Sequence, residues 1–326
     1  MSVIGQTFLP AECLIVDDAS TDDTVSKCQT LIDGYSGPVR FEILHHDRHR
    51  GVSASRNTGT YAAKGDYIYY LDSDDEMTAD CLEKLVKPVL DDNSFEMVVG
   101  DFLIDRHEIS GAGSRHSVFK ANSLNGTPSE LHTNAEIRAW FYRKGENRSV
   151  NLWNRLLKLQ FVRENKLYCK EGLLYEDQLW AFYLMRCLNN AAFVDEVTYI
   201  YYRRPSSIMT GTRYNDKLNY FGAIFQEVAD NVVPGRYIDE VRHFARILCG
   251  FYPDASDDSR YRHAYDVFYR ELSDCRHCGE RTALALTRLL STSRAGRRIC
   301  RANLKLYEKL LMLKRIVLKR LKKKRS

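Results

Sequence analysis

Short apolar runs alternate with amphipathic segments through the first hundred residues. Apolar runs lie at 12–16, 39–44 and 67–71, and they are rich in residues that favour strands. The intervening segments, 24–35 and 51–59, have the polar and small residues of helices packed on a sheet, and Ser20 or Thr21 is a natural N-cap for the first. This alternation predicts an α/β fold with parallel strands.

Acidic side chains follow the first and third apolar runs. Asp17 and Asp18 end the first run, and Asp72 and Asp74 end the third. Open α/β sheets bind ligands at the carboxyl ends of their strands. Neighbouring carboxylates repel each other, so a cation stabilises them, and oxygen ligands favour Mg2+ or Mn2+. The alternative is a solvated acidic turn that precedes the helix expected from about Thr78.

The rest of the chain adds further strands and then becomes helical. After a helix from Asp80 and a strand at 97–100, residues 105–135 are polar and give no clear pattern. The pair Glu176-Asp177 opens another helix, and a strand at 193–204 has a basic end. Four helices and a basic amphipathic helix follow, at 214–233, 237–251, 261–272, 282–290 and 304–325.

Charge is distributed unevenly along the chain. The net charge is +5, but residues 294–325 carry fourteen basic residues and one acid, which leaves −8 on the remainder. A narrow apolar stripe edged with Lys and Arg is typical of a helix that lies on an anionic membrane surface, so 304–325 is predicted to bind one and nucleic acid is not expected. A packed C-terminal helix with a solvated basic end is the alternative.

Several classes of protein do not fit the composition. No run approaches the roughly 18 apolar residues of a membrane span, and the first residues lack the pattern of a signal peptide. Nine scattered cysteines suit reduced thiols better than a disulfide framework, and Cys275 and Cys278 lack the second pair that a zinc site needs. The chain is therefore expected in the cytoplasm, with the tail as a peripheral contact to the inner face of the plasma membrane.

Three blocks together resemble the nucleotide-sugar half of family 2 glycosyltransferases. They are Val16-Asp17-Asp18-Ala19-Ser20-Thr21-Asp22, Gly51-Val52-Ser53-Ala54-Ser55-Arg56-Asn57-Thr58-Gly59 and Leu71-Asp72-Ser73-Asp74-Asp75, in the order and spacing of that family. The resemblance implies a GT-A fold, a Rossmann-like and mostly parallel sheet flanked by helices. It also implies that Asp17 and Asp18 contact the nucleoside, that Arg56 lies near base or phosphate, and that Asp72 and Asp74 hold the metal. Without it, Asp17 and Asp18 would cap a helix and Arg56 would pair with an acid.

A second resemblance covers the acceptor half of the bacterial members. Trp153-Asn154-Arg155-Leu156 precedes Glu176-Asp177-Gln178-Leu179-Trp180 by about twenty residues. This similarity assigns the general base to Asp177 with Glu176 in support, places Trp153 and Trp180 on the acceptor side, and puts Arg203 near the diphosphate. Taken alone, an acid in a first helical turn is a dipole partner worth about 0.3–1 kcal/mol, Trp180 is a core aromatic and Arg203 forms a structural ion pair.

These resemblances define the expected organisation and function. A GT-A domain at 1–211, with a nucleotide-sugar half at about 1–104 and an acceptor half at about 135–211, precedes a helical region at 212–326. The expected reaction moves a sugar with inversion from a nucleoside diphosphate-sugar, UDP-sugar being favoured, to the hydroxyl of a glycan or lipid-linked glycan in cell-surface polysaccharide synthesis. An inactive membrane-associated remnant and a nucleotidyltransferase are the alternatives.

The start of the chain departs from the family pattern. Family members open with a strand and a helix before a segment like Ser2-Val3-Ile4-Gly5-Gln6-Thr7-Phe8, which here begins the sequence. Loss of a central strand would leave its neighbours with unpaired backbone groups, at a cost large against a total stability of about 5–15 kcal/mol. A misplaced start codon or a truncated gene is therefore expected.

Overall fold

The computed structural model describes residues 1–110, 113–142, 150–203, 212–273 and 279–291. The described residues fall into two compact units. The first takes its residues from Met1–Phe141 and Arg148–Thr212, and the second from Tyr142–Asn147 and Arg213–Ser326.

Two separate sheets form the first unit. β1 (Glu12–Asp17) and β2 (Arg40–His45) pair in parallel and make a two-stranded sheet. The second sheet has seven strands. Its main path runs in the order β3-β8-β5-β9-β4, with bounds Tyr67–Tyr69, Arg155–Lys158, Met97–Ser110, Ala191–Arg203 and Glu76–Met77.

The larger sheet is mixed rather than mostly parallel. β5 and β9 pair in parallel, but β8 lies antiparallel between β3 and β5. β6 (Gly113–Lys120) and β7 (Glu130–Leu131) add antiparallel pairs to β5 and β9. The prediction of an α/β fold is confirmed, and β1-β2 and β5-β9 are parallel as expected. The expectation of a mostly parallel sheet is wrong for the larger sheet, because a short buried strand such as β8 carries no sequence signal of its direction.

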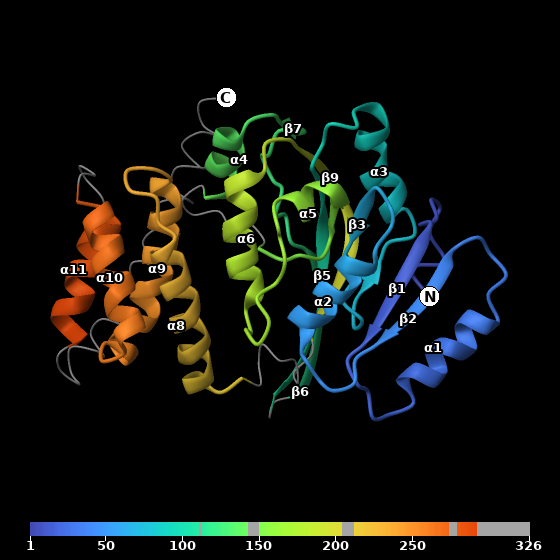
Figure 1. Cartoon of the computed structure of the whole chain (residues 1–326), viewed down its shortest axis with the longest axis horizontal. Coiled ribbons are helices and arrows are strands. Elements are labelled where there is room, and N and C mark those ends of the chain that lie inside the picture. The colour runs from blue at the N-terminus through green and yellow to red at the C-terminus, as the bar shows by residue number, and fades with distance from the viewer. Residues whose placement is uncertain (111–112, 143–149, 204–211, 274–278, 292–326) are drawn as a thin grey trace. The chain divides into compact units, whose positions relative to one another are not determined.

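Helices cover the sheets of the first unit (Figure 1). Their bounds are α1 Thr24–Asp33, α2 Val52–Ala62, α3 Cys81–Asp91, α4 Asn134–Phe141, α5 Leu159–Glu164 and α6 Glu176–Cys187. The apolar face of α3, which includes Leu82 and Leu85, packs with Phe95 and Val98 in a core cluster. Ser20 and Thr21 do not cap α1, because the helix begins at Thr24, whose amide donates to Asp22.

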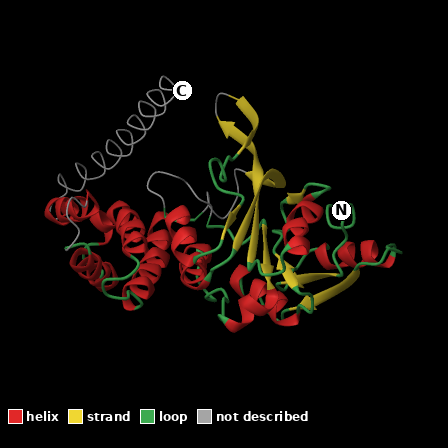
Figure 2. Ribbon diagram, turned by 90° about the horizontal axis from the view of Figure 1, so that it is seen from above, coloured by secondary structure: helices red, strands yellow, loops and turns green. Residues whose placement is uncertain are grey.

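A hairpin formed by β5 and β6 is the main element that the sequence pattern does not predict. It pairs Leu103–Ser110 with Gly113–Lys120 and extends away from the rest of its sheet (Figure 2). Val118 and Phe119 are 51% and 46% exposed, so this ribbon lacks the buried face that gives a strand its apolar alternation.

The second unit is helical in its described residues. It contains α8 (Tyr214–Asp230), α9 (Ile238–Ala255), α10 (Ser259–Glu271) and α11 (Gly279–Ser291), close to the predicted helices. Phe225, buried on α8, packs edge-on against Tyr261 of α10. The predicted amphipathic helix at 304–325 lies outside the described residues. Among the helices that the structure describes, none is long and apolar enough to cross a membrane.

Candidate active site

Arg56 of α2 joins the two acidic segments that the sequence singles out. Its Nη2 donates to Oδ1 of Asp72, just beyond β3 (2.8 Å), and its Nη1 donates to Oε1 of Glu176, the first residue of α6. The Arg56 side chain is only 12% exposed. Burial alone would lower its pKa, but the charges of Asp72 and Glu176 outweigh burial and hold the pKa above its usual value. Arg56 therefore pairs with one acid beyond β3 and one at the start of α6.

Asp177 is held in the first turn of α6, beside Glu176. The preceding Tyr175 has a φ of 64°, in the left-handed region that a bulky side chain seldom adopts, and such strain clusters at functional sites. Burial, followed by repulsion from Glu176, raises the pKa of Asp177 to about 6. A carboxylate with this pKa is ionised at neutral pH and basic enough to accept a proton.

Asp75, to which the sequence analysis assigns no role, anchors the acidic turn after β3. Tyr199 of β9 donates its hydroxyl hydrogen to Oδ2 of Asp75 (2.8 Å), and the amide of Tyr202 donates to Oδ1 (2.9 Å). The amide of Asp72 donates to the same Tyr199 hydroxyl (3.3 Å). Burial raises the pKa of Asp75 to about 6 despite these bonds. The sequence shows the third acid of the turn, but not that it faces β9.

Asp72 and Asp74 form a pair of carboxylates that suits a small divalent cation. Asp72 is partly exposed and Asp74 exposed, and the repulsion of both acids contributes to the raised pKa of Asp75. Among the described residues no group of three or more Asp, Glu, His or Cys side chains is placed to hold a metal. A pair fits Mg2+ or Mn2+ nevertheless, because these ions commonly take one or two carboxylates and complete their shell with phosphate oxygens and water.

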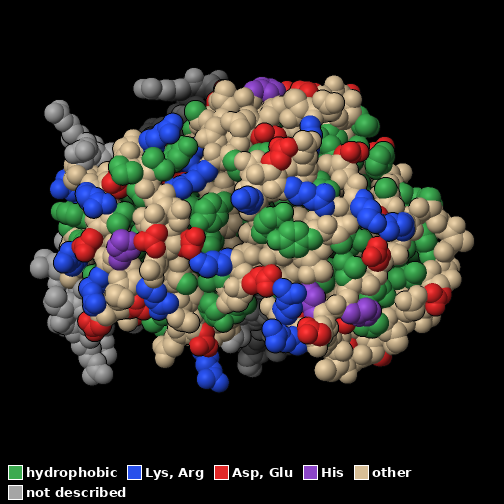
Figure 3. All heavy atoms as spheres, viewed as in Figure 1, with side chains coloured by type: hydrophobic (Ala, Val, Ile, Leu, Met, Phe, Trp, Pro, Cys, Tyr) green, Lys and Arg blue, Asp and Glu red, His purple; other side chains and the backbone are tan. Residues whose placement is uncertain are grey.

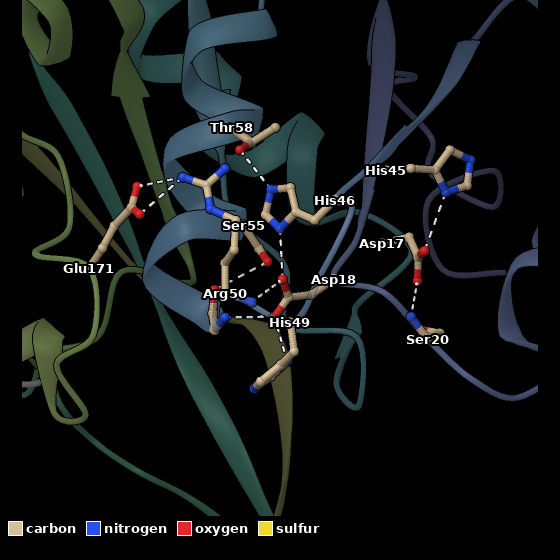
Figure 4. Close-up of polar contacts among 11 residues, drawn as sticks. Asp17, Asp18, Ser20, His45, His46, His49, Arg50, Ser55, Thr58 and Glu171 are labelled. Atoms are coloured by element: carbon tan, nitrogen blue, oxygen red, sulfur yellow. Dashed lines mark hydrogen bonds and ion pairs between the residues drawn. The ribbon is translucent and has the colours of Figure 1, made fainter.

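Asp18 fastens the end of β1 to α2 and the loop before it (Figure 4). Its Oδ1 accepts hydrogen bonds from His46 Nδ1 (2.6 Å) and the Arg50 amide (2.8 Å). Its Oδ2 accepts from the Gly51 amide (2.7 Å) and pairs with the exposed imidazole of His49 (2.8 Å). Burial would raise the pKa of Asp18, but these bonds dominate and lower it to about 2.

The acceptor capacity of Asp18 is already filled, unlike that of Asp17. An ionised carboxylate offers about four lone-pair sites, and Asp18 uses that number. Asp17 accepts one bond from the Ser20 amide (3.1 Å) and one contact from His45 (3.2 Å), as Figure 4 shows. A nucleoside therefore has more room for hydrogen bonds at Asp17, and at Asp18 it would have to displace a present partner such as His49.

His46 and Asn57 are structural links that the sequence analysis does not identify. His46, whose side chain is 4% exposed, joins Asp18 to Thr58 of α2 through its two ring nitrogens (2.6 and 2.9 Å). Asn57 binds the backbone of Cys169 in both directions, with distances of 2.9 and 2.8 Å. These contacts fix α2 between the end of β1 and the segment that leads to α6.

The other residues predicted for the site, Trp153, Trp180 and Arg203, differ in how exposed they are. Trp180 is 2% exposed and donates its indole hydrogen to the Leu167 carbonyl (3.1 Å), so it is a core residue and not a sugar-stacking surface. Trp153 is 8% exposed and stacks on Tyr199 at 4.5 Å, which places it against the ring that holds the acidic turn. Arg203 is exposed at the end of β9.

Arg155 of β8 is a buried cation close to this region. It is 2% exposed, and its Nε donates to the Asn151 carbonyl (2.5 Å). Burial lowers the pKa of Arg155 to about 10, and the charge of Asp177 opposes that shift. Its charge therefore contributes to the field at Asp177, although no sequence motif distinguishes it from an exposed arginine.

The fold is an α/β architecture with acids at the ends of two strands and an acidic pair at the start of a helix. Residues 1–149, somewhat less than half of the chain, match the family model of glycosyl transferase family 2. The structure is also similar to the GT-A-type crystal structure of S. aureus TarS in complex with UDP (TM-score 0.56, 17% identity, 94% of this chain and 86% of that one).

Curated relatives are similar over about two thirds of this chain. A cholesterol galactosyltransferase of Borreliella burgdorferi is 26% identical over 206 residues, which are 63% of this chain and 55% of the relative. The glycosyltransferase GlyG of Streptococcus pneumoniae is 24% identical over 209 residues, 64% of this chain and 66% of the relative. The chain thus spans between about half and two thirds of these relatives.

Proposed function

We propose that this chain is an inverting glycosyltransferase that moves a sugar from a nucleoside diphosphate-sugar, most simply a UDP-sugar, to an acceptor hydroxyl. The observation that carries the proposal is the bridge of Arg56 between Asp72 and Glu176. This bridge brings the acidic turn beyond β3 next to the acid pair that opens α6. A donor site and a general base must lie close together in this way if they are to act in one reaction. The match of residues 1–149 to glycosyl transferase family 2 and the similarity to the UDP-bound TarS structure support the donor class.

Asp177 is the general base in this mechanism. Its carboxylate accepts the proton of the acceptor hydroxyl while that oxygen forms a bond to the anomeric carbon. The bond from the anomeric carbon to the diphosphate oxygen breaks on the opposite face, which inverts the configuration. Glu176 pairs with Arg56, and its negative charge contributes to the raised pKa of Asp177, which makes Asp177 a stronger base.

The leaving diphosphate requires positive charge. Asp72 and Asp74 would hold Mg2+ or Mn2+, which when bound supplies Lewis-acid stabilisation of the diphosphate. Arg203, exposed at the end of β9, is the side chain that we assign to the same phosphates. We assign the contact with the nucleoside to Asp17, while Asp18 holds the loop before α2 through the Arg50 and Gly51 amides.

The acceptor is a glycan or lipid-linked glycan of a cell-surface polysaccharide. Relatives named as glycosyltransferases support sugar transfer to an acceptor, and because the name of one gives cholesterol as its acceptor, the glycan is our own assignment. On the face shown in Figure 3, acidic and basic side chains of the described residues are interspersed. We assign attachment to an anionic membrane, at the inner face of the plasma membrane, to residues 304–325.

Calorimetry with UDP, with and without Mn2+, tests the nucleotide site, and release of UDP from a panel of UDP-sugars tests turnover. Metal-dependent binding followed by UDP release with an oligosaccharide acceptor is the expected result. Binding without release for any acceptor would favour the inactive remnant. Pyrophosphate formation from UTP and a sugar phosphate would favour a nucleotidyltransferase.

A further inference from the structure

Trp153, which the resemblance places on the acceptor side, packs against aromatic side chains of β9 and β5. Its indole lies parallel to the ring of Tyr199 (centroids 4.5 Å apart, 10° between the planes) and nearly parallel to that of Tyr201 (5.6 Å, 18°). The ring of Phe102 lies perpendicular to it at 4.9 Å. Trp153 is only 8% exposed, so little of its surface is left for stacking on a sugar.

The neighbouring Asn154 fixes the backbone that carries this indole. Asn154 has a φ of 59°, in the left-handed region that Asn adopts more readily than most residues. Its side-chain amide donates to the carbonyls of Gly100 (2.9 Å) and Asp101 (3.1 Å) in β5. Its Oδ1 accepts from the hydroxyl of Thr198 in β9 (2.7 Å). Trp153 is therefore held in place by bonds from the next residue to both strands.

The hydroxyl of Tyr199 contacts both ends of the acidic turn. This turn, residues 72–75, is closed by a bond from the Asp75 amide to the Asp72 carbonyl (3.1 Å). Tyr199 donates to Oδ2 of Asp75 (2.8 Å), and its oxygen accepts from the Asp72 amide (3.3 Å). Tyr199 is 0% exposed, so bulk water does not compete for these bonds.

The backbone of Tyr199 is fixed by pairing on both sides of β9. Tyr199 lies opposite Phe102 in the parallel ladder with β5 and opposite Met77 in the antiparallel ladder with β4. The Thr78 amide, just beyond β4, adds a bond to the carbonyl of Thr198 (3.0 Å). With the backbone held by the sheet, the place of the hydroxyl depends on the orientation of the ring. That orientation is set by the stack with Trp153.

We propose that Trp153 and Tyr199 are positioning residues of the donor site. The indole of Trp153 holds the Tyr199 ring, and the Tyr199 hydroxyl holds the turn of residues 72–75 in the shape that binds metal and diphosphate. This inference rests on the proposed function and moves Trp153 from the acceptor side to the donor side. In this role neither side chain touches the donor itself. Both act through the carboxylates of the turn.

Calorimetry with UDP, with and without Mn2+, measures the effect on binding. Tyr199→Phe keeps the ring and removes the hydroxyl. Affinity for UDP in the presence of Mn2+ should fall by about 10- to 100-fold, as is usual when a group that orients metal-binding side chains is removed. Affinity without metal should stay the same. Trp153→Leu should show the same selective loss, whereas stacking of Trp153 on an acceptor sugar predicts no change in UDP affinity.

Hydrogen exchange of the Asp72 amide, measured by NMR without metal or nucleotide, reports on the turn itself. Because this amide donates to the Tyr199 hydroxyl, its exchange should become about fivefold faster in both variants, as the loss of one hydrogen bond implies. The Thr78 amide is the internal control. It bonds the Thr198 carbonyl and should keep its exchange rate if the pairing of β4 with β9 is intact.

Tyr67→Phe is the matched control variant. Tyr67 in β3 also donates its hydroxyl hydrogen within the sheet, to the Phe95 carbonyl (3.0 Å), but it has no bond to the turn. Its loss should change neither UDP affinity nor exchange at Asp72. Trp153→Phe, which keeps an aromatic ring, takes the place of Trp153→Leu if circular dichroism shows that the latter does not fold.

The double variant tests whether Trp153 acts through Tyr199. Since both changes affect one hydroxyl, the double variant should bind UDP with Mn2+ about as weakly as the weaker of the two single variants. Losses that multiply would show that Trp153 acts by another route and would overturn its assigned role.

The positioning role is overturned if the parent chain binds UDP with Mn2+ and both single variants bind it equally well. It is also overturned if affinity falls as much without metal as with it, or if exchange at Thr78 rises together with that at Asp72. Either result would mean that the variants loosen the sheet as a whole. A parent chain that binds no UDP would overturn the proposed function and, with it, the donor role of these residues.

Discussion

Asp72 and Glu176, distant in the sequence, accept hydrogen bonds from the same guanidinium, that of Arg56. Each carboxylate lies at a point where its segment changes structure, one beyond β3 and the other at the first residue of α6. A single buried cation therefore fixes the position of the acidic turn relative to the helix that carries Asp177. The proposed donor and acceptor sides depend on this contact for their alignment.

Replacing Arg56 with Met should destabilise the fold markedly. The Glu176 side chain is 9% exposed and would lose its ion pair with Arg56. A buried charge that is left without its partner costs about 3–5 kcal/mol. Arg56→Lys keeps the charge but cannot hold two carboxylates in a fork, so it should lose less stability and still lose about 10²-fold in turnover. Urea unfolding and UDP-release rates measure the two effects.

Arg40 provides the matched control for Arg56. It also pairs with two acids, Glu12 and Glu42, but its side chain is 46% exposed and solvent screens the interaction. Arg40→Met should leave unfolding nearly unchanged. Equal losses for the Arg40 and Arg56 variants would show that the buried bridge has no special role.

Replacing Asp177 with Asn should separate catalysis from stability. Transfer should fall by about 10²–10⁴-fold because the base is lost, while affinity for UDP changes little. The rise in the pKa of Asp177 from 3.8 to about 6 corresponds to about 3 kcal/mol in favour of its neutral form. Because Asn is always neutral, Asp177→Asn should raise the free energy of unfolding at pH 8 by at most that amount. Turnover that survives would remove Asp177 from the role of base.

The pH dependence of turnover should follow Asp177. Its pKa in the folded chain is raised to about 6, so the carboxylate is ionised above this pH and protonated below it. We expect kcat to fall about tenfold per pH unit below about 6 and to level off above it. Asp18 should not make the affinity for UDP depend on pH in this range, because its pKa of about 2 keeps its carboxylate ionised. A flat profile between pH 5 and 7 would contradict the assignment.

The same raised pKa has a consequence for folding. The folded state retains the Asp177 proton to higher pH than the unfolded chain, so this group makes stability decrease as pH rises from about 4 to about 6. The Asn variant should lack that component. Urea midpoints of both proteins across this range provide the measurement.

Local patterns predicted those elements whose burial is periodic or continuous. The helix from Glu176 and the strand before Asp72 are examples, since apolar spacing and a polar end mark both. The β5-β6 hairpin gave no such signal because its outer part has no buried face. Strand direction in the mixed sheet also depends on tertiary pairing, as the antiparallel position of β8 illustrates.

The site was predictable in its residue types more than in its contacts. Acids after strands identify Asp72 and Asp18, but not that Arg56 binds the first or that His46 holds the second, because these contacts form between separate elements. The sequence also did not predict that Trp180 lies in the core. The spacing of an aromatic residue in an amphipathic helix is the same whether the side chain packs in the core or stacks on a sugar.

Asp74 gives the sharpest test of the metal pair. It is exposed beside Asp72, so Asp74→Ala removes a carboxylate without opening a cavity, and the fold should keep its stability. Affinity for UDP in the presence of Mn2+ should fall at least tenfold, whereas affinity without metal should stay the same. Calorimetry under both conditions measures the difference. As a control, Asp91→Ala changes an exposed acid at the end of α3 and should alter the affinity for UDP neither with nor without Mn2+. If Asp74→Ala and the parent chain bind UDP equally well with Mn2+, Asp74 is excluded as a metal ligand.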